Sequence, residues 1–312
     1  MLARIGKNKM KRWFYYSLGA AFLFLIILFF YLFFLKTADT QPEEVFPSYD
    51  SSGRLLVMTA SFPVFEFARI VGGDQAAVSL ILPPSTELHH FVPSEETFKE
   101  ITKSAIFFYT SDILEPWAEE LEITNKVAVA NDLANEEGDP HVWLDFSLAS
   151  QMVENISLVY QEIDPINKKS YQERAAAYQE ELRLLDQEFQ IGLANCQWRE
   201  LIIAGHNTFA YLAQRYNLNY HSLQGFIPDD SVDVEKIIFL SETLKKSGQP
   251  YVFFEELIMP YLGSLLRQGA GVELLALNAA HNVGRFDTIS GITFLSLMRN
   301  NLKTLQLGLV CQ

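Results

Sequence analysis

The sequence has only two cysteines among its 312 residues, Cys196 and Cys311. They match no C-x-x-C pattern, and this argues against a metal site built on the pair. Two cysteines allow a single disulfide, and an extracytoplasmic location would permit one. The sequence alone does not decide between a disulfide and two free thiols.

Basic residues are scarce once the first 36 residues are set aside. The chain has 24 Lys and Arg against 38 Asp and Glu, a formal net charge of −14. Residues 1–36 hold six of the basic residues and no acid, so the remainder has 18 basic and 38 acidic residues, a net charge of −20. A domain this acidic lacks the basic surface that nucleic-acid binding needs. It is compatible with gathering cations.

Long uncharged apolar runs are lacking except at residues 14–35, where 22 residues carry no charge. As a helix this segment would be about 33 Å long, enough to cross a bilayer. It is longer than the apolar part of a cleavable signal peptide, and the residues that follow form a poor cleavage site. No cysteine lies nearby for lipid attachment. The five basic residues before the segment predict a cytoplasmic N-terminus, with residues 37–312 outside.

We therefore predict a single-pass protein of the cell membrane with an extracytoplasmic ectodomain. Residues 1–36 would form the basic cytoplasmic tip and the transmembrane anchor. Residues 37–53 are polar and show little apolar periodicity, so they are expected to form a solvated linker.

Short apolar runs alternate with helical patterns from residue 54 onward. Strands are expected at 55–60, 77–82, 105–109, 127–130, 201–204, 220–223, 251–254 and 274–277. Helices are expected at 64–71, 95–103, 147–162, 209–216, 234–246 and 293–309. Strands that are almost wholly apolar and separated by helices are typical of a parallel sheet buried on both faces. The pattern predicts an α/β fold of two lobes, residues 54–165 and 198–312.

A long helix is expected between the two lobes, within residues 166–197. Its apolar residues recur every three or four positions, at Tyr171, Ala175, Tyr178, Leu182, Leu185, Phe189 and Leu193. A helix of about 28 residues would be about 42 Å long, more than the width of one domain. We expect it to be rigid and to tie the lobes together. A coiled-coil arm is the alternative, although the stripe lacks repeated heptads.

The residues that carry chemistry are histidines placed after predicted strands. Four of the six histidines have this placement, namely His89, His141, His206 and His281. Ligands of open α/β sheets bind outside the carboxyl ends of the strands, so these side chains should converge between the lobes. Pro140 stiffens the loop that carries His141. Neutral imidazole is the commonest protein ligand for a borderline metal such as zinc. For His221 a hydrogen-bonded surface histidine is the preferred interpretation.

The chain resembles the zinc- and manganese-binding solute-binding proteins of ABC-type metal importers, over about residues 54–311. Residues 139–145 match the family's D-P-H-x-W-L-[DN] in full. Residues 88–94 are similar to its D-P-H-x-[FY]-x-P-[ST], and residues 205–212 to its H-x-A-F-x-Y-[FL]. The resemblance implies two lobes joined by a rigid helix, with metal held between them by His89, His141 and His206. It also implies an ABC permease and its ATPase subunit as partners.

The sequence departs from the family at the fourth ligand. Asn278 stands where the family has an acid, and an amide carbonyl is a weak ligand for zinc. Water, Glu87 and His281 are the other candidates, and we favour water or Glu87. Glu87 and Leu88 also replace the usual Asp-Pro before the first ligand, and the acidic loop at 131–138 has no histidine. Three imidazoles favour Zn²⁺ as the transported ion over Mn²⁺, which prefers carboxylates and water.

Three other functions stay open at this point. A manganese-specific carrier would use the same site. A zinc-dependent hydrolase could pair three histidines and a water with Glu255 or Glu256 as the base, but no H-E-x-x-H motif occurs. A metal-dependent adhesin is the third. The sequence favours a carrier with no catalytic residues over an enzyme.

Overall fold

The computed structural model describes residues 48–134, 138–226, 234–256, 261–284 and 291–312. Contacts divide the chain into Met1–Phe46 and Pro47–Gln312, and every described residue belongs to the second unit. The predicted membrane span at 14–35 and the predicted linker as far as residue 47 lie outside the described residues. Within those ranges, no helix has both the length and the apolar character needed to span a membrane.

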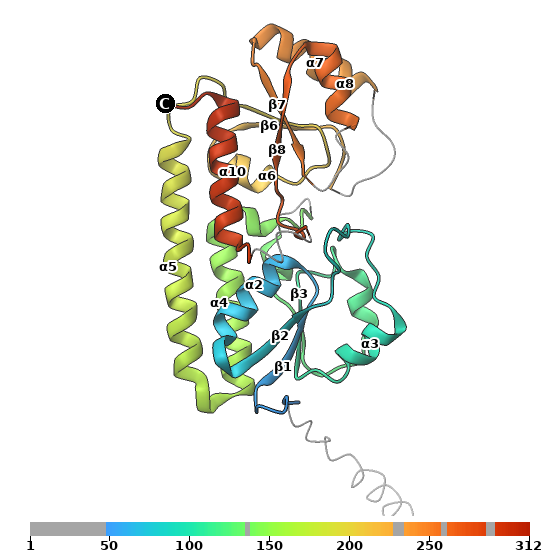
Figure 1. Cartoon of the computed structure of the whole chain (residues 1–312), viewed down its shortest axis with the longest axis vertical. Helices are drawn as coiled ribbons and strands as arrows, with labels where there is room; N and C mark the ends of the chain where they lie inside the picture. The colour runs from blue at the N-terminus through green and yellow to red at the C-terminus, as the bar shows by residue number, and fades with distance from the viewer. Residues whose placement is uncertain (1–47, 135–137, 227–233, 257–260, 285–290) are drawn as a thin grey trace, which may run out of the picture. The chain divides into compact units, whose positions relative to one another are not determined.

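The first lobe is built on a sheet of four parallel strands in the order β2-β1-β3-β4 (Figure 1). Its strands are β1 (Leu55–Thr59), β2 (Ala76–Leu80), β3 (Ile106–Tyr109) and β4 (Lys126–Ala128). Its helices are α2 (Phe62–Gly72), α3 (Glu95–Ile101) and α4 (Phe146–Ile163). All four residues of β3 are buried, Ile106 and Phe108 in the main core and Phe107 and Tyr109 in a second cluster. The central strand is thus covered on both faces, as its apolar sequence predicts.

The second lobe has the same topology, with four parallel strands in the order β6-β5-β7-β8. Its strands are β5 (Glu200–Ile203), β6 (Asn219–Ser222), β7 (Tyr251–Glu255) and β8 (Glu273–Leu277). Its helices are α6 (Ala210–Arg215), α7 (Val234–Ser247), α8 (Tyr261–Ala270) and α10 (Phe294–Leu309). On one face α10 packs so closely that a Cβ at Gly308 would lie 2.3 Å from the Phe253 ring. Helix α8 was not predicted from the sequence, because its two glycines lower the helix propensity of the segment.

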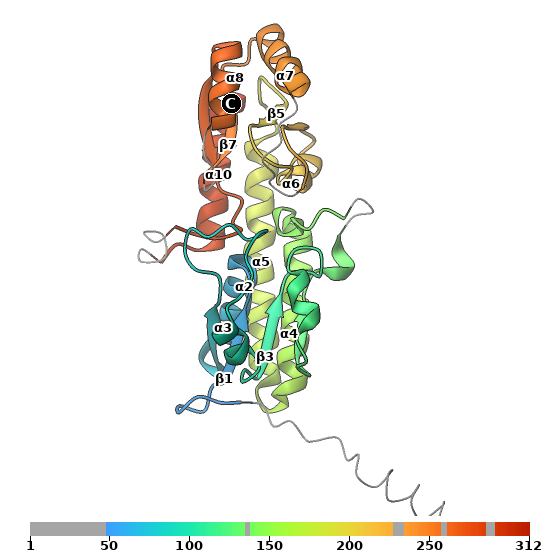
Figure 2. The same ribbon diagram turned by 90° about the vertical axis from the view of Figure 1, so that its right-hand side faces the viewer.

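Helix α5 (Lys168–Gly192) runs beside helices of both lobes for 25 residues (Figures 1 and 2). It packs against α4 and α2 of the first lobe and against α10 of the second. Its buried side chains are Tyr171, Ala175, Tyr178, Leu182, Leu185, Asp186 and Phe189. The stripe expected from the sequence therefore faces neighbouring helices rather than a coiled-coil partner. The prediction of two parallel-sheet lobes joined by a long helix is confirmed.

A disulfide joins Cys196, which follows α5, to Cys311, which follows α10. The sulfur atoms are 1.99 Å apart, and 115 positions separate the two residues in the sequence. The choice between a disulfide and free thiols, which the sequence left open, is decided in favour of the disulfide. The bond closes the second lobe onto the end of the long helix.

Five short 3-10 helices connect the described elements, and one of them shapes the loop after β4. They are Gly73–Gln75, Pro116–Glu120, Asn131–Leu133, Val142–Leu144 and Pro165–Asn167. The turn Val142–Leu144 directly follows His141 and leads into α4. Asp145 caps α4, because its carboxylate accepts a hydrogen bond from the Ser147 amide at 2.8 Å.

Candidate metal centre

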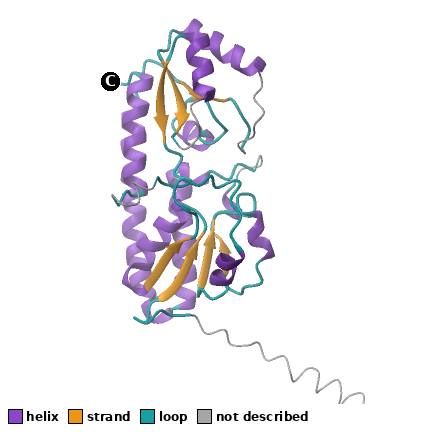
Figure 3. Cartoon of the chain, turned by 45° about the vertical axis from the view of Figure 1, so that its right-hand side comes forward, coloured by secondary structure: helices purple, strands orange, loops and turns teal. Residues whose placement is uncertain are grey.

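The carboxyl ends of the two sheets face each other, and the loops that follow the strands fill the space between them (Figure 3). Four of these loops bring one histidine each to a common point: His89, His141, His206 and His281. One ring nitrogen from each side chain lies within 4.8 Å of the other three. The Nε2 atoms of His89 and His141 are 3.2 Å apart. Two loops come from each lobe, so the group exists only when the lobes are together.

The imidazoles in this group are held away from water. His141 and His206 are fully buried, and the side chain of His89 is 2% exposed. Burial, followed by the proximity of the neighbouring histidines, lowers the pKa values of His141 and His281 well below the usual range. Neutral imidazole is therefore the stable form of both side chains, and it is also the form that binds a metal.

Acidic side chains lie behind the first two histidines and fix their rings. Glu87 Oε1 lies 2.5 Å from His89 Nδ1, and Asp139 Oδ1 lies 2.7 Å from His141 Nδ1. Burial raises the pKa of Glu87, but the hydrogen bonds that its carboxylate accepts from His89 are the main cause that outweighs burial and brings the value to about 2. An ionised carboxylate at Nδ1 holds the proton there and leaves Nε2 with its lone pair toward the group.

His206 is held differently. Its Nδ1 lies 2.9 Å from Glu255 Oε2, close enough for an ion pair but not aligned as a hydrogen bond. Its Nε2 lies 2.8 Å from the hydroxyl of Thr208, which also contacts Glu255. The ring is thus fixed by a buried carboxylate and a buried hydroxyl.

His281 completes the group from the second lobe. Its Nε2 is buried and has no hydrogen-bond partner among the described residues. A buried nitrogen without a partner costs about 1–3 kcal/mol, which a bound cation would offset. The loop is held in place just before this residue and at its own carbonyl. The Ala280 amide donates to Asn278 Oδ1 at 2.8 Å, and the Phe62 amide donates to the His281 carbonyl at 3.3 Å.

The other candidate ligands lie outside the four-nitrogen group. Glu87 stands behind His89, and the side chain of Asn278 is engaged by the Ala280 amide and by Glu256, 2.9 Å away. His90 is exposed, and His221 pairs with Glu200 at 2.9 Å on the sheet of the second lobe. Two arguments from the sequence gave different candidates for the fourth ligand. Its position after a predicted strand favoured His281, whereas the position of the family's acidic ligand corresponds to Asn278.

A family model described as ZnuA, zinc-uptake complex component A, periplasmic, matches residues 57–308. This chain belongs to the ZnuA family. The resemblance drawn from the sequence motifs is confirmed, and the family is one of uptake-complex components rather than enzymes.

Two relatives show how far the likeness extends. The chain is 28% identical over 302 residues to the zinc-binding protein AdcA of Streptococcus pyogenes serotype M3, covering 86% of this chain and 58% of AdcA. It is 26% identical over 299 residues to the high-affinity zinc uptake system protein ZnuA of Bacillus subtilis, covering 88% and 93%. This ZnuA-family chain thus spans somewhat more than half the length of its AdcA relatives.

Among solved structures, the Zn(II)-bound ZnuA-like domain of Streptococcus pneumoniae AdcA is similar, with 31% identity and a TM-score of 0.72. The match covers 82% of this chain and 99% of that domain. The likeness therefore includes both lobes and the long helix.

Proposed function

We propose that this chain binds one Zn²⁺ ion between its lobes and delivers it to an ABC importer. His89, His141 and His206 would be ligands, as the family motifs imply. His281 would be the fourth ligand, in place of water, Glu87 or Asn278. The observation that carries the proposal is the convergence of four buried imidazoles, one of which has no partner for its Nε2 among the described residues.

The spacing of the first two ligands suits zinc. In a tetrahedral site with Zn–N bonds of about 2.0–2.1 Å, ligand nitrogens lie about 3.3–3.4 Å apart. The Nε2 atoms of His89 and His141 are separated by 3.2 Å. Glu87 and Asp139 contact the Nδ1 atoms of the two rings, so the Nε2 atoms are the nitrogens that face each other at this distance. A cation between them would be coordinated by both.

The ligand set also favours zinc over manganese. All four donors are imidazole nitrogens, and Mn²⁺ prefers carboxylates and water. Carboxylates do stand nearby, but Glu87 and Asp139 lie behind the rings and contribute charge rather than donor atoms. They would balance the charge of a divalent ion held by neutral ligands. A manganese-specific carrier is the alternative that uses the same residues.

For the rest of the chain, we carry forward the organisation expected from the sequence. Residues 1–36 would carry the anchor, with its span at 14–35, and residues 37–53 would link it to the ectodomain. The lobes would be 54–165 and 198–312, with the connecting helix at 166–197. The partners would be a membrane permease and its ATPase subunit. Recovery of the mature protein in the soluble fraction, with an N-terminus after Lys36, would contradict the anchor.

Titration of the metal-free chain with zinc tests the proposal. We expect a stoichiometry near one per chain, with Mn²⁺ displaced by zinc in competition. A chain that binds no zinc, or that binds Mn²⁺ at least as tightly, would contradict the zinc assignment. Hydrolytic turnover by the zinc-loaded chain would favour the hydrolase. Genes for a permease and an ATPase beside the gene for this chain would favour the carrier over an adhesin.

A further inference from the structure

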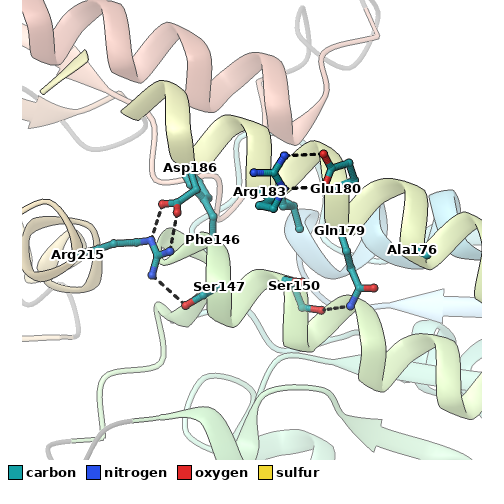
Figure 4. A pocket seen from close by; sticks show the side chains of 10 residues that line it. Phe146, Ser147, Ser150, Ala176, Gln179, Glu180, Arg183, Asp186 and Arg215 are labelled. Carbon is teal, nitrogen blue, oxygen red and sulfur yellow. Dashed lines mark hydrogen bonds and ion pairs between the residues drawn. The ribbon is translucent and has the colours of Figure 1, made fainter. Parts of the chain in front are cut away.

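We infer that Arg215 is a positioning residue that holds the His141 and His206 loops in register for metal binding. This inference rests on the proposed zinc function. Arg215 is the last residue of α6 in the second lobe, and its guanidinium reaches the long helix and the first lobe. Its Nε and Nη2 atoms lie 2.6 and 2.7 Å from the two carboxylate oxygens of Asp186 on α5 (Figure 4). Its Nη1 atom lies 2.9 Å from Asp145 Oδ1.

Asp145 connects Arg215 to the His141 loop over a short distance along the chain. Asp145 is four residues from His141, and the 3-10 turn Val142–Leu144 fills the interval. The turn is closed by a hydrogen bond from the Leu144 amide to the His141 carbonyl, at 3.2 Å. A displacement of Asp145 would therefore also displace His141, because a single hydrogen-bonded turn connects them. The Ser147 hydroxyl also accepts a hydrogen bond from Arg215 Nη1, at 3.0 Å (Figure 4).

The other end of α6 leads to His206. Ala210 begins the helix four residues after His206, and the buried Phe209 lies directly before it. Tyr211 adds a second link across the lobes, because its hydroxyl donates to the Asp139 carbonyl at 3.3 Å. One helix of the second lobe thus carries contacts to residues on both sides of His141.

Asp186 on α5 holds the Arg215 guanidinium in place. Its carboxylate accepts from Arg215, from the Tyr216 hydroxyl at 2.8 Å and from Gln190 at 2.8 Å. Burial raises the pKa of Asp186, but the hydrogen bonds from Arg215 and Tyr216 outweigh it, so the pKa is lowered and the carboxylate is ionised. A guanidinium makes these paired contacts through a planar fork, and a lysine ammonium cannot reproduce them.

The same helix offers a matched control. Arg183 lies on α5 and binds Glu180 through Nε and Nη2, both at 2.7 Å, so it repeats the Arg–carboxylate geometry within one helix (Figure 4). Among the described residues, its ion pair is with Glu180 and not with a loop that carries a histidine of the group. Arg183→Lys should therefore disturb a pair of the same Arg–carboxylate geometry, although a more exposed one, without reaching the metal centre.

The experiment compares Arg215→Lys, Asp145→Asn and their double variant with Arg183→Lys in the full chain. Zinc release is followed by chelator competition, and amide hydrogen exchange of residues 141–145 is measured without metal. We expect Arg215→Lys and Asp145→Asn each to speed zinc release at least tenfold and to speed loop exchange. The double variant should be no worse than Arg215→Lys alone, because Arg215→Lys already breaks the contact between Arg215 and Asp145 that Asp145→Asn removes. Arg183→Lys should stay within twofold of the wild type.

Three results separate the inference from the zinc proposal. If the wild type binds zinc and Arg215→Lys matches it in release rate and loop exchange, the positioning role is overturned. If Arg215→Lys lowers the free energy of unfolding but leaves the zinc release rate and the loop exchange unchanged, Arg215 stabilises the fold without positioning the histidine loops. If the wild type binds no zinc while Arg215→Lys still speeds loop exchange, the zinc proposal fails and the ordering of the His141 loop by Arg215 stands.

Discussion

The indole Nε1 of Trp143 donates a buried hydrogen bond to the carbonyl oxygen of Ala279, at 2.8 Å. Trp143 lies two residues after His141, and Ala279 lies two residues before His281. One hydrogen bond therefore joins the loops that bring a histidine from each lobe. Trp143 is fully buried, and its ring lies against both His141 and His281, with centroids 5.4 and 5.5 Å away.

Trp143→Phe should weaken zinc binding and lower the free energy of unfolding by about 1–3 kcal/mol, because the buried Ala279 carbonyl loses its donor. Urea unfolding and zinc titration measure the two effects. Trp117→Phe is the control, since Trp117 packs among Phe91, Phe98 and Phe107 within the first lobe. It should reduce stability without changing zinc affinity. Wild-type zinc affinity in Trp143→Phe would argue against the role of this link.

His281→Ala should weaken zinc binding by more than tenfold, or above about 1.4 kcal/mol, because the ion would lose one of four imidazoles. His90→Ala is the matched control, since His90 adjoins His89 in sequence but is exposed and outside the group. Competition with a chelator of known affinity gives both constants. If His281→Ala bound zinc about as tightly as His90→Ala, His281 would not be a ligand, and water or Glu87 would be the fourth ligand.

We expect Glu115 to make the free energy of unfolding depend on pH, independently of metal binding. It is fully buried, and burial raises its pKa to about 7 despite hydrogen bonds from the Ser111 amide and from Thr110. The folded state therefore binds this proton more tightly than the unfolded chain. Its contribution to stability is full below pH 4.5, the ordinary value for this group, and is lost as the pH rises through 7.

Glu115→Gln keeps an acceptor for those donors but cannot ionise. Relative to this variant, the wild type should lose free energy of unfolding, on the order of 2–3 kcal/mol, between pH 5 and pH 8. Urea unfolding at the two pH values measures the difference, in which the other titrating groups cancel. Parallel pH profiles for the two proteins would show that folding does not raise the pKa of Glu115.

The disulfide should matter for stability and little for zinc. Replacing Cys196 and Cys311 together by serine should lower the free energy of unfolding by about 2–4 kcal/mol, because a long loop of the unfolded chain is no longer closed. The bond lies past the C-terminal end of α10, whereas the His281 loop precedes the start of that helix (Figure 1). Zinc affinity should therefore stay within twofold. A large loss of affinity would mean that the end of α5 positions the metal centre.

Local pattern in the sequence was sufficient for most elements of the fold. The apolar run around Phe107 predicted a strand covered on both faces, and the spacing from Tyr171 to Phe189 predicted the buried stripe of α5. Both follow from periodicities of two and 3.6 residues, which a window of sequence contains. Helix α8 was missed because its two glycines lower its helix propensity, and packing against α7 and the second sheet stabilises it.

Some features of the metal centre likewise follow from local sequence, and others follow from contacts between distant parts of the chain. The sequence by itself determined that His89, His141 and His206 follow strand ends, because strands and loops are local features. The tertiary structure decided which side chain joins them. The loop after β8 turns at Ala280, whose φ is +57°, and is tied to Trp143 of the other lobe. These contacts direct His281 into the group and leave Asn278 bonded to Ala280 and Glu256. Pairings across more than 100 positions, such as Trp143 with Ala279 or Cys196 with Cys311, depend on how the lobes pack, and no local pattern encodes that.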